Sequence, residues 1–185
     1  KDKYLLTAES VTAGHPDKLC DTIADSILDA CLKDDPNARV ACEVMATAGK
    51  ILVAGELRTT AQPDVEAIVR QTVRQAGYDC NYNVEVRLHT QSPDIAGAVD
   101  GDTLGAGDQG IMYGYACWET VELLPAPVVL ANRITSLLTT CREEKLISGI
   151  GPDGKAQVSV QYAFGVPERV DTIVISCQHD ADKDP

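Results

Sequence analysis

The sequence predicts an α+β fold in which pairs of β-strands alternate with single helices. Apolar residues recur every four positions through residues 19–31, which is the spacing of a helix with one buried face. Two β-rich runs, residues 39–47 and 51–60, flank a short turn that contains glycine and indicate a hairpin. A second pair of β-rich runs, residues 156–164 and 169–177, indicates another hairpin near the end of the chain.

The remaining elements follow from the same patterns in chain order. Residues 4–8 predict a short strand, and Pro16 suits the first turn of the helix that runs to about residue 32. A second helix is expected between Pro63 and Gly77. Residues 91–107 are rich in Gly, Asp, Ser and Pro and indicate a loop. Three further segments are predicted as two strands and a helix, in that order: residues 84–89, 111–118 and 126–141.

The charge of the chain excludes some classes of partner. Its 185 residues carry 16 Lys and Arg against 28 Asp and Glu, a formal net charge of -12. An acidic chain lacks the basic face that nonspecific binding to nucleic acid or to anionic membranes requires, so neither is expected as a partner. No apolar run approaches the roughly 20 residues of a membrane span, and the charged start does not resemble a signal peptide.

The cysteines and histidines indicate the compartment rather than a metal site. The 7 cysteines include no CxxC pair, and the 3 histidines lie far apart in sequence, which argues against a zinc site. Scattered, unpaired thiols are typical of the reducing cytosol, so we expect a cytoplasmic protein.

Three glycine-containing motifs carry the chemistry of the chain: residues 14–18 (GHPDK), 105–110 (GAGDQG) and 151–155 (GPDGK). Glycine lets the backbone approach a ligand closely, and carboxylates hold hard metal ions. Lysine and histidine can meet phosphate oxygens. Together the three motifs predict a site for a metal ion and a polyphosphate.

The first motif lies at the expected start of a helix, where free N–H groups favour an anion. His15 can donate to a phosphate oxygen or stabilise a negative leaving group, and Asp17 can hold Mg²⁺. The alternative is an ordinary capped helix start with a solvated histidine.

The other two motifs have plain alternatives as well. Asp108 can accept hydrogen bonds from ribose hydroxyls, although residues 105–110 could also form only a tight turn. Residues 151–155 match a hairpin turn, but Lys155 enters the following strand, which would hold its cation rigidly over a site. Glu43 and Glu56 lie on the two strands of the first hairpin, where the alternative to a functional role is an exposed strand face.

The chain resembles the methionine adenosyltransferases, also called S-adenosylmethionine synthetases. Family motifs occur in family order over essentially the whole chain. They are ESV with GHPDK, an ACE strand, a GE strand, QSPDI, GAGDQG, a PDxK turn and a VSxQH strand end. Here they stand at residues 9–18, 41–43, 55–56, 91–95, 105–110, 152–155 and 175–179.

The resemblance implies an activity and roles for residues. Family members make S-adenosylmethionine from ATP and L-methionine and release phosphate and diphosphate. His15 would assist departure of the triphosphate, and Lys155 would act with it as a catalytic residue. The remaining roles implied are as follows: Mg²⁺ at Asp17 and Glu9, K⁺ at Glu43, methionine at Glu56 and Gln91, and ATP at Glu9, His15, Asp108, Asp153 and Lys155.

The resemblance also implies a larger architecture. The family fold has three similar sheet-and-helix domains around a pseudo-threefold axis, of which this chain would hold about half. Three parts are expected: an incomplete N-terminal-type domain (1–12 and 111–185), an incomplete central-type domain (13–93) and a loop and lid segment of the third domain (94–110).

Family members run to roughly twice this length, and their GGGAFSGKD segment, with further phosphate and metal ligands, is absent here. The loop at residues 96–104 is also shorter than the corresponding loop in most family members. We therefore expect that the chain is a fragment and that a second chain carries the missing half. The alternative function is a noncatalytic or regulatory subunit that keeps the fold but needs such a partner.

The family further implies a homodimer or a dimer of dimers with active sites shared between subunits. One surface for this contact would be the apolar strand face that carries Val40, Cys42, Val44, Ile51 and Val53, although these residues could equally pack on their own helices.

Overall fold

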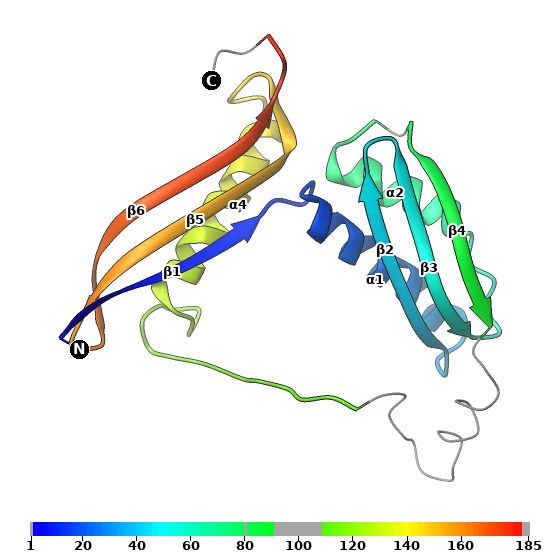
Figure 1. Ribbon diagram of the computed structural model, residues 1–185, viewed down its shortest axis with the longest axis horizontal. Coiled ribbons are helices and arrows are strands. Elements are labelled where there is room, and N and C mark those ends of the chain that lie inside the picture. The colour runs from blue at the N-terminus through cyan, green and yellow to red at the C-terminus, as the bar shows by residue number, and fades with distance from the viewer. Residues whose placement is uncertain (1, 80, 91–108, 183–185) are drawn as a thin grey trace. The chain divides into compact units, whose positions relative to one another are not determined.

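The computed structural model describes residues 2–79, 81–90 and 109–182 (Figure 1). The chain forms two compact units, each with one three-stranded sheet. The first unit comprises Lys1–Lys18, Ala76–Tyr78 and Gly114–Pro185, and the second comprises Leu19–Gln75 and Asp79–Tyr113. The predicted α+β class is therefore confirmed. Among the described residues, no helix combines the length and apolar character needed to cross a membrane.

The sheet of the first unit is antiparallel and has the strand order β1-β5-β6. Its strands are β1 (Lys3–Val11), β5 (Ile150–Ala163) and β6 (Val166–His179). The helix α4 (Ala126–Glu143) packs on β1 and β5. Ala131 of α4 and three alternate residues of β5, Val158, Val160 and Tyr162, are buried and form the core. The period of two along β5 places these side chains on the face that α4 covers.

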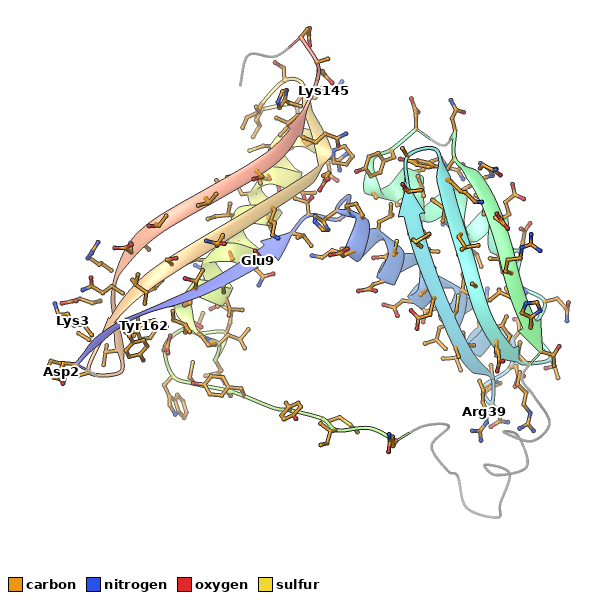
Figure 2. The ribbon with its side chains drawn as sticks, in the orientation of Figure 1. Asp2, Lys3, Glu9, Arg39, Lys145 and Tyr162 are labelled. Carbon is orange, nitrogen blue, oxygen red and sulfur yellow. The ribbon has the colours of Figure 1, made fainter. Side chains whose placement is uncertain are left out.

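Tyr162 ties β5 to the start of α4. Its hydroxyl donates to Glu119 Oε2 at 2.5 Å, and the same oxygen accepts from the backbone N–H of Ala126 at 2.9 Å. Burial of Tyr162 and its hydrogen bond to Glu119 raise the pKa of the phenol well above its usual range. Tyr4 of β1 stacks on the ring, with the ring centroids 5.1 Å apart. Figure 2 shows Tyr162 at the end of the sheet where β1 begins.

The strand β6 has apolar side chains that remain half exposed on one face of the sheet. Ile173 and Ile175 lie opposite Val158 and Ala156 in the β-ladder, so they share the face that α4 covers. Each nevertheless remains 50% exposed. Over the part of the chain that the structure describes, α4 shields β5 and leaves this side of β6 without a covering layer.

The second unit contains two helices and a mixed sheet with the order β2-β3-β4. The strands β2 and β3 form an antiparallel hairpin, and α2 connects β3 to the parallel strand β4. The elements are α1 (Pro16–Asp34), whose first residues belong to the first unit, β2 (Arg39–Thr47), β3 (Lys50–Arg58), α2 (Val65–Ala76) and β4 (Asn83–Thr90). Figure 1 shows both helices on one face of this sheet.

The core of the second unit comes from the predicted apolar stripes of α1 and α2. Ile23 and Ile27 of α1, Val69 of α2, and Ile51 and Val53 of β3 are fully buried. The apolar strand face that includes Ile51 and Val53 therefore packs within its own unit. Ile51 and Val53 thus pack on the helices of their own unit, which was one of the two alternatives for this face. Val40, Cys42 and Val44 are only partly buried, and contact of this face with another subunit stays a prediction.

The carboxylate of Asp35 joins the end of α1 to the end of β3. It accepts hydrogen bonds from the backbone N–H of Thr60 at 2.8 Å, the hydroxyl of Thr59 at 3.0 Å and the N–H of Asn37 at 3.1 Å. These hydrogen bonds, with that from Thr60 as the largest contribution, lower the pKa of Asp35 below its usual value. The ionised carboxylate thus stabilises this corner of the unit.

One predicted strand is absent. Residues 111–118 have no regular structure, and most of their side chains are exposed, with Met112 at 92%. A strand needs a neighbour for its backbone hydrogen bonds, and no described strand pairs with this segment. The prediction was wrong because an apolar run favours an extended strand but does not supply a neighbouring strand for it to pair with. The predicted loop at residues 91–107 lies outside the described residues.

We expect Tyr162→Phe to lower the free energy of unfolding by about 1.5–3 kcal/mol, because a buried hydrogen bond to a charged group is lost. Glu119 Oε2 would then keep the hydrogen bond from the backbone N–H of Ala126. Urea unfolding followed by circular dichroism measures the change. A free energy of unfolding equal to that of the parent chain would show that the hydroxyl does not tie β5 to α4.

Candidate functional site

The turn between β1 and α1 is bound to the first residues of β5. The backbone N–H of Thr12 donates to Gly154 O at 2.9 Å, and the Thr12 hydroxyl donates to Pro152 O at 2.7 Å. Thr12 is buried. The register of β5 against β6 is irregular between Ile150 and Gly154, and Pro152 lies within that stretch. Residues 151–155 thus lie within β5 and do not form a hairpin turn.

Gly14 permits the closest approach in this turn. A Cβ atom built on Gly14 would lie 2.5 Å from the carbonyl oxygen of Pro152, closer than real side chains come. Glycine is therefore required by space. The contact brings the GHPDK motif, residues 14–18, beside the GPDGK motif, residues 151–155, although 137 residues separate their first positions (151 minus 14).

His15 follows this contact and is partly buried, with 21% of its side chain exposed. Its backbone N–H donates to Thr12 O at 3.1 Å. Its Nδ1 accepts from the backbone N–H of Asp17 at 3.3 Å and lies 3.8 Å from Asp17 Oδ2. A neutral ring whose Nδ1 accepts carries its proton on Nε2, and that atom can donate to a ligand.

The ion pair between Glu9 of β1 and Lys155 of β5 stands on neighbouring strands. Lys155 Nζ lies 2.9 Å from Glu9 Oε1, and the side chains are 42% and 53% exposed. Figure 2 shows Glu9 toward the end of β1 from which the chain enters α1. An ion pair this exposed contributes only about 0–1 kcal/mol, so Lys155 can exchange Glu9 for a phosphate at little cost.

Gln178 of β6 holds the irregular start of β5. Its Oε1 accepts from the backbone N–H of Asp153 at 3.3 Å, and a Cβ on Gly151 would overlap the same oxygen. The adjoining Cys177 has a raised pKa, because burial and then the charge of Asp153 both disfavour the thiolate. Gln178 belongs to one of the sequence motifs, but the sequence alone assigned it no role. Thr12 was also assigned no role, although it lies between the ESV and GHPDK parts of the first motif stretch, residues 9–18.

The structure thus places five predicted site residues in the first unit: Glu9, His15, Asp17, Asp153 and Lys155. Glu43 and Glu56 lie in the second unit on β2 and β3, and their register puts both on the face opposite Ile51 and Val53. Glu43 is exposed and Glu56 is partly buried. Gln91 and Asp108 lie outside the described residues.

The donor set fits only one mode of binding the predicted metal ions. Within residues 2–79, 81–90 and 109–182, no group of three or more His, Cys, Asp or Glu side chains is placed to hold a metal. Mg²⁺ commonly takes one or two carboxylates and completes its shell with water and substrate phosphates. Asp17, which is 89% exposed, fits that mode, whereas Glu9 is turned toward Lys155.

We expect Gly14→Ala to separate the two motifs, because the added methyl group would meet the Pro152 carbonyl. The expected result is a lower melting temperature and changed amide resonances for Thr12 and Gly154. Gly114→Ala is the matched control, since a Cβ there meets no atom within 4 Å. Equal melting temperatures for the two variants would contradict the close approach.

The chain matches known proteins over nearly its whole length. The N-terminal domain of S-adenosylmethionine synthetase matches residues 3–101, and the central domain of the same family matches residues 103–184. An S-adenosylmethionine synthase of a Nitratiruptor species is 49% identical over 190 residues, covering 97% of this chain and 49% of the relative. One from a Parafrankia species is 46% identical over 202 residues, covering 97% and 51%. The chain spans about half the length of these curated relatives, and it belongs to the S-adenosylmethionine synthetase family.

Proposed function

We propose that this chain provides part of the active site of a methionine adenosyltransferase, which makes S-adenosylmethionine from ATP and L-methionine. The observation that carries the proposal is the meeting of the GHPDK and GPDGK motifs at the turn after β1. That meeting puts a histidine donor, a lysine and an exposed carboxylate in one unit. The relatives' name, S-adenosylmethionine synthase, supports the same activity.

In the proposed reaction the methionine sulfur forms a bond to C5′ of ATP with its own lone pair. The C5′–O5′ bond breaks, its electron pair leaves with the triphosphate, and water then cleaves the triphosphate to phosphate and diphosphate. A neutral sulfur nucleophile needs alignment and no general base, whereas the leaving group needs its charge stabilised. His15 Nε2 donates to that charge, and Lys155 leaves Glu9 to meet it.

Metal ions and further ligands complete the proposal. Mg²⁺ supplies positive charge to the phosphates when bound, with Asp17 as the ligand that fits and Glu9 as a second candidate. K⁺ is proposed at Glu43. Asp153 contacts the nucleotide. Three residues proposed by family resemblance complete the substrate contacts: Asp108 at the ribose, and Glu56 with Gln91 at methionine.

The net charge of the chain makes the proposed site depend on cations. Because the formal net charge is -12, a nucleotide meets an unfavourable field over most of the surface. Lys155 is partly neutralised by Glu9 before any ligand binds. Phosphate must therefore displace Glu9 or bind together with a cation. A site of this kind depends on metal ions more strongly than one built from arginine clusters.

The larger assembly is also a proposal. The two compact units have bounds similar to the predicted division into residues 1–12 with 111–185 and residues 13–93. The family domains match in a different order along the chain, with the N-terminal domain at residues 3–101 and the central domain at residues 103–184. The predicted lid segment, residues 94–110, lies outside the described residues except for its last two positions. We propose a cytoplasmic homodimer or dimer of dimers with shared active sites, completed where needed by a second chain that carries the other half of the relatives' length.

The competing function is a noncatalytic or regulatory subunit that keeps the fold but needs a partner. Incubation with ATP, methionine, Mg²⁺ and K⁺ distinguishes the two. Formation of S-adenosylmethionine by the 185-residue chain alone would exclude the noncatalytic subunit. Formation only after addition of the C-terminal half of a relative would favour a chain that needs a partner. No product under either condition would contradict the proposed enzyme.

Replacement of His15 by alanine should lower the rate of S-adenosylmethionine formation by about 100-fold or more. Its effect on ATP affinity should be much smaller, because the contact forms mainly with charge that develops in the transition state. Single-turnover kinetics and equilibrium binding measure the two effects in the assembly that makes product. A rate equal to that of the parent protein would remove His15 from the mechanism.

If sites are shared between subunits, a mixture of His15→Ala and Glu56→Ala proteins should recover activity. Random reassociation would create some sites with both intact residues, one from each subunit. Each variant incubated with itself is the control. No recovery after verified subunit exchange would indicate that His15 and Glu56 serve the same subunit's site.

A further inference from the structure

The side chain of Tyr78 forms a hydrogen bond with the turn that precedes His15. The hydroxyl of Tyr78 donates to the carbonyl oxygen of Gly14 at 2.7 Å. The segment Ala76–Tyr78 follows α2 in sequence but belongs to the first unit, with Gly14 and His15. The contact therefore joins residues that are 64 positions apart within one compact unit.

The Gly14 carbonyl needs such a partner because of where it lies. Gly14 is buried, and a buried carbonyl without a hydrogen bond is costly. The helix α1 begins only at Pro16. The other half of the same peptide group, the N–H of His15, donates to Thr12 O. Tyr78 thus satisfies the peptide oxygen that lies directly before His15.

The backbone of Tyr78 is itself held in place. Gly77 has a φ of +102°, which favours glycine, and a Cβ atom there would overlap the guanidinium of Arg142 on α4. Arg142 therefore fills the space beside Gly77. Arg142 of α4 thus packs beside the backbone that precedes Tyr78, whereas the turn is held on the β5 side by the hydrogen bonds of Thr12.

We propose that Tyr78 is a positioning residue for His15, which acts through the Gly14 carbonyl to fix the direction of the imidazole. The inference rests on the proposed function, in which His15 meets the departing triphosphate. The plane of the peptide between Gly14 and His15 sets the direction of the His15 side chain. That peptide is held on both sides, by the His15 N–H on Thr12 O and by the Tyr78 hydroxyl on the Gly14 oxygen, and loss of the hydroxyl leaves only the first restraint. Displacements of about 1 Å are enough to cost about 100-fold in rate.

The test uses the 185-residue chain labelled with ¹⁵N at histidine, with the ring resonances of His15 identified by their loss in His15→Ala. We expect Tyr78→Phe to shift or broaden these resonances in the free protein. Mg²⁺-tripolyphosphate, which carries the charge of the leaving group, should bind about 10-fold more weakly to this variant. Unchanged His15 resonances together with unchanged affinity would overturn the proposal.

Tyr162→Phe is the matched control, because it removes another tyrosine hydroxyl from the same unit and its partner Glu119 is outside the turn. It should lower the stability of the chain and leave the His15 resonances and the tripolyphosphate affinity as they are. Equal effects of both variants on His15 would mean general loosening of the unit, which also overturns the positioning role.

A second variant, Arg142→Met, replaces Tyr78→Phe in the test if Tyr78→Phe does not fold. Arg142→Met keeps the Tyr78 hydroxyl and removes the guanidinium that packs beside Gly77, so we expect a smaller shift of the His15 resonances. Unchanged resonances in that case would overturn the proposal. Failure of the proposed function is recognised separately, since His15 resonances of the parent chain would then not respond to tripolyphosphate at all.

Discussion

The contact of Gly14 with Pro152 is the constraint on which the rest of the site depends. It requires a residue without a side chain, two peptide carbonyls within reach of one hydroxyl and a buried threonine that donates to both. Because these groups are buried, their hydrogen bonds cannot be exchanged for water without cost. The end of β1, the start of α1 and the start of β5 are therefore fixed relative to one another. The ionisable side chains on these segments start from a fixed backbone.

The helices and most strands could be predicted from the sequence because their apolar periodicity is local. The prediction failed for residues 111–118, where the pattern suits a strand but no described neighbour pairs with it. Likewise, the apolar residues of β6 were predicted correctly as a strand, but Ile173 and Ile175 stay half exposed. Local pattern determines the tendency of a segment, whereas burial depends on which other segments reach it.

The candidate site divides in the same way. The motifs indicated His15 and Lys155, among others, because glycine, carboxylate and cation at short spacing have a recognisable chemistry. The residues that hold them, Thr12, Tyr78 and Gln178, act through backbone carbonyls and N–H groups of residues far away in sequence. Residue spacing and composition do not predict such contacts, so they were identified only from the structure.

The two ends of the β1–β5 pair show why one sheet can serve both stability and binding. At one end, the hydroxyl of the buried Tyr162 is bonded to Glu119, and burial together with this hydrogen bond raises the pKa of the phenol. At the other end, Glu9 and Lys155 form an ion pair that water already reaches. Breaking the first contact takes a hydrogen bond from the buried Tyr162 hydroxyl, whereas breaking the second returns two charges to solvent. Ligand exchange is therefore confined to the end where it costs the fold least, and the strands need not separate for Lys155 to change its partner.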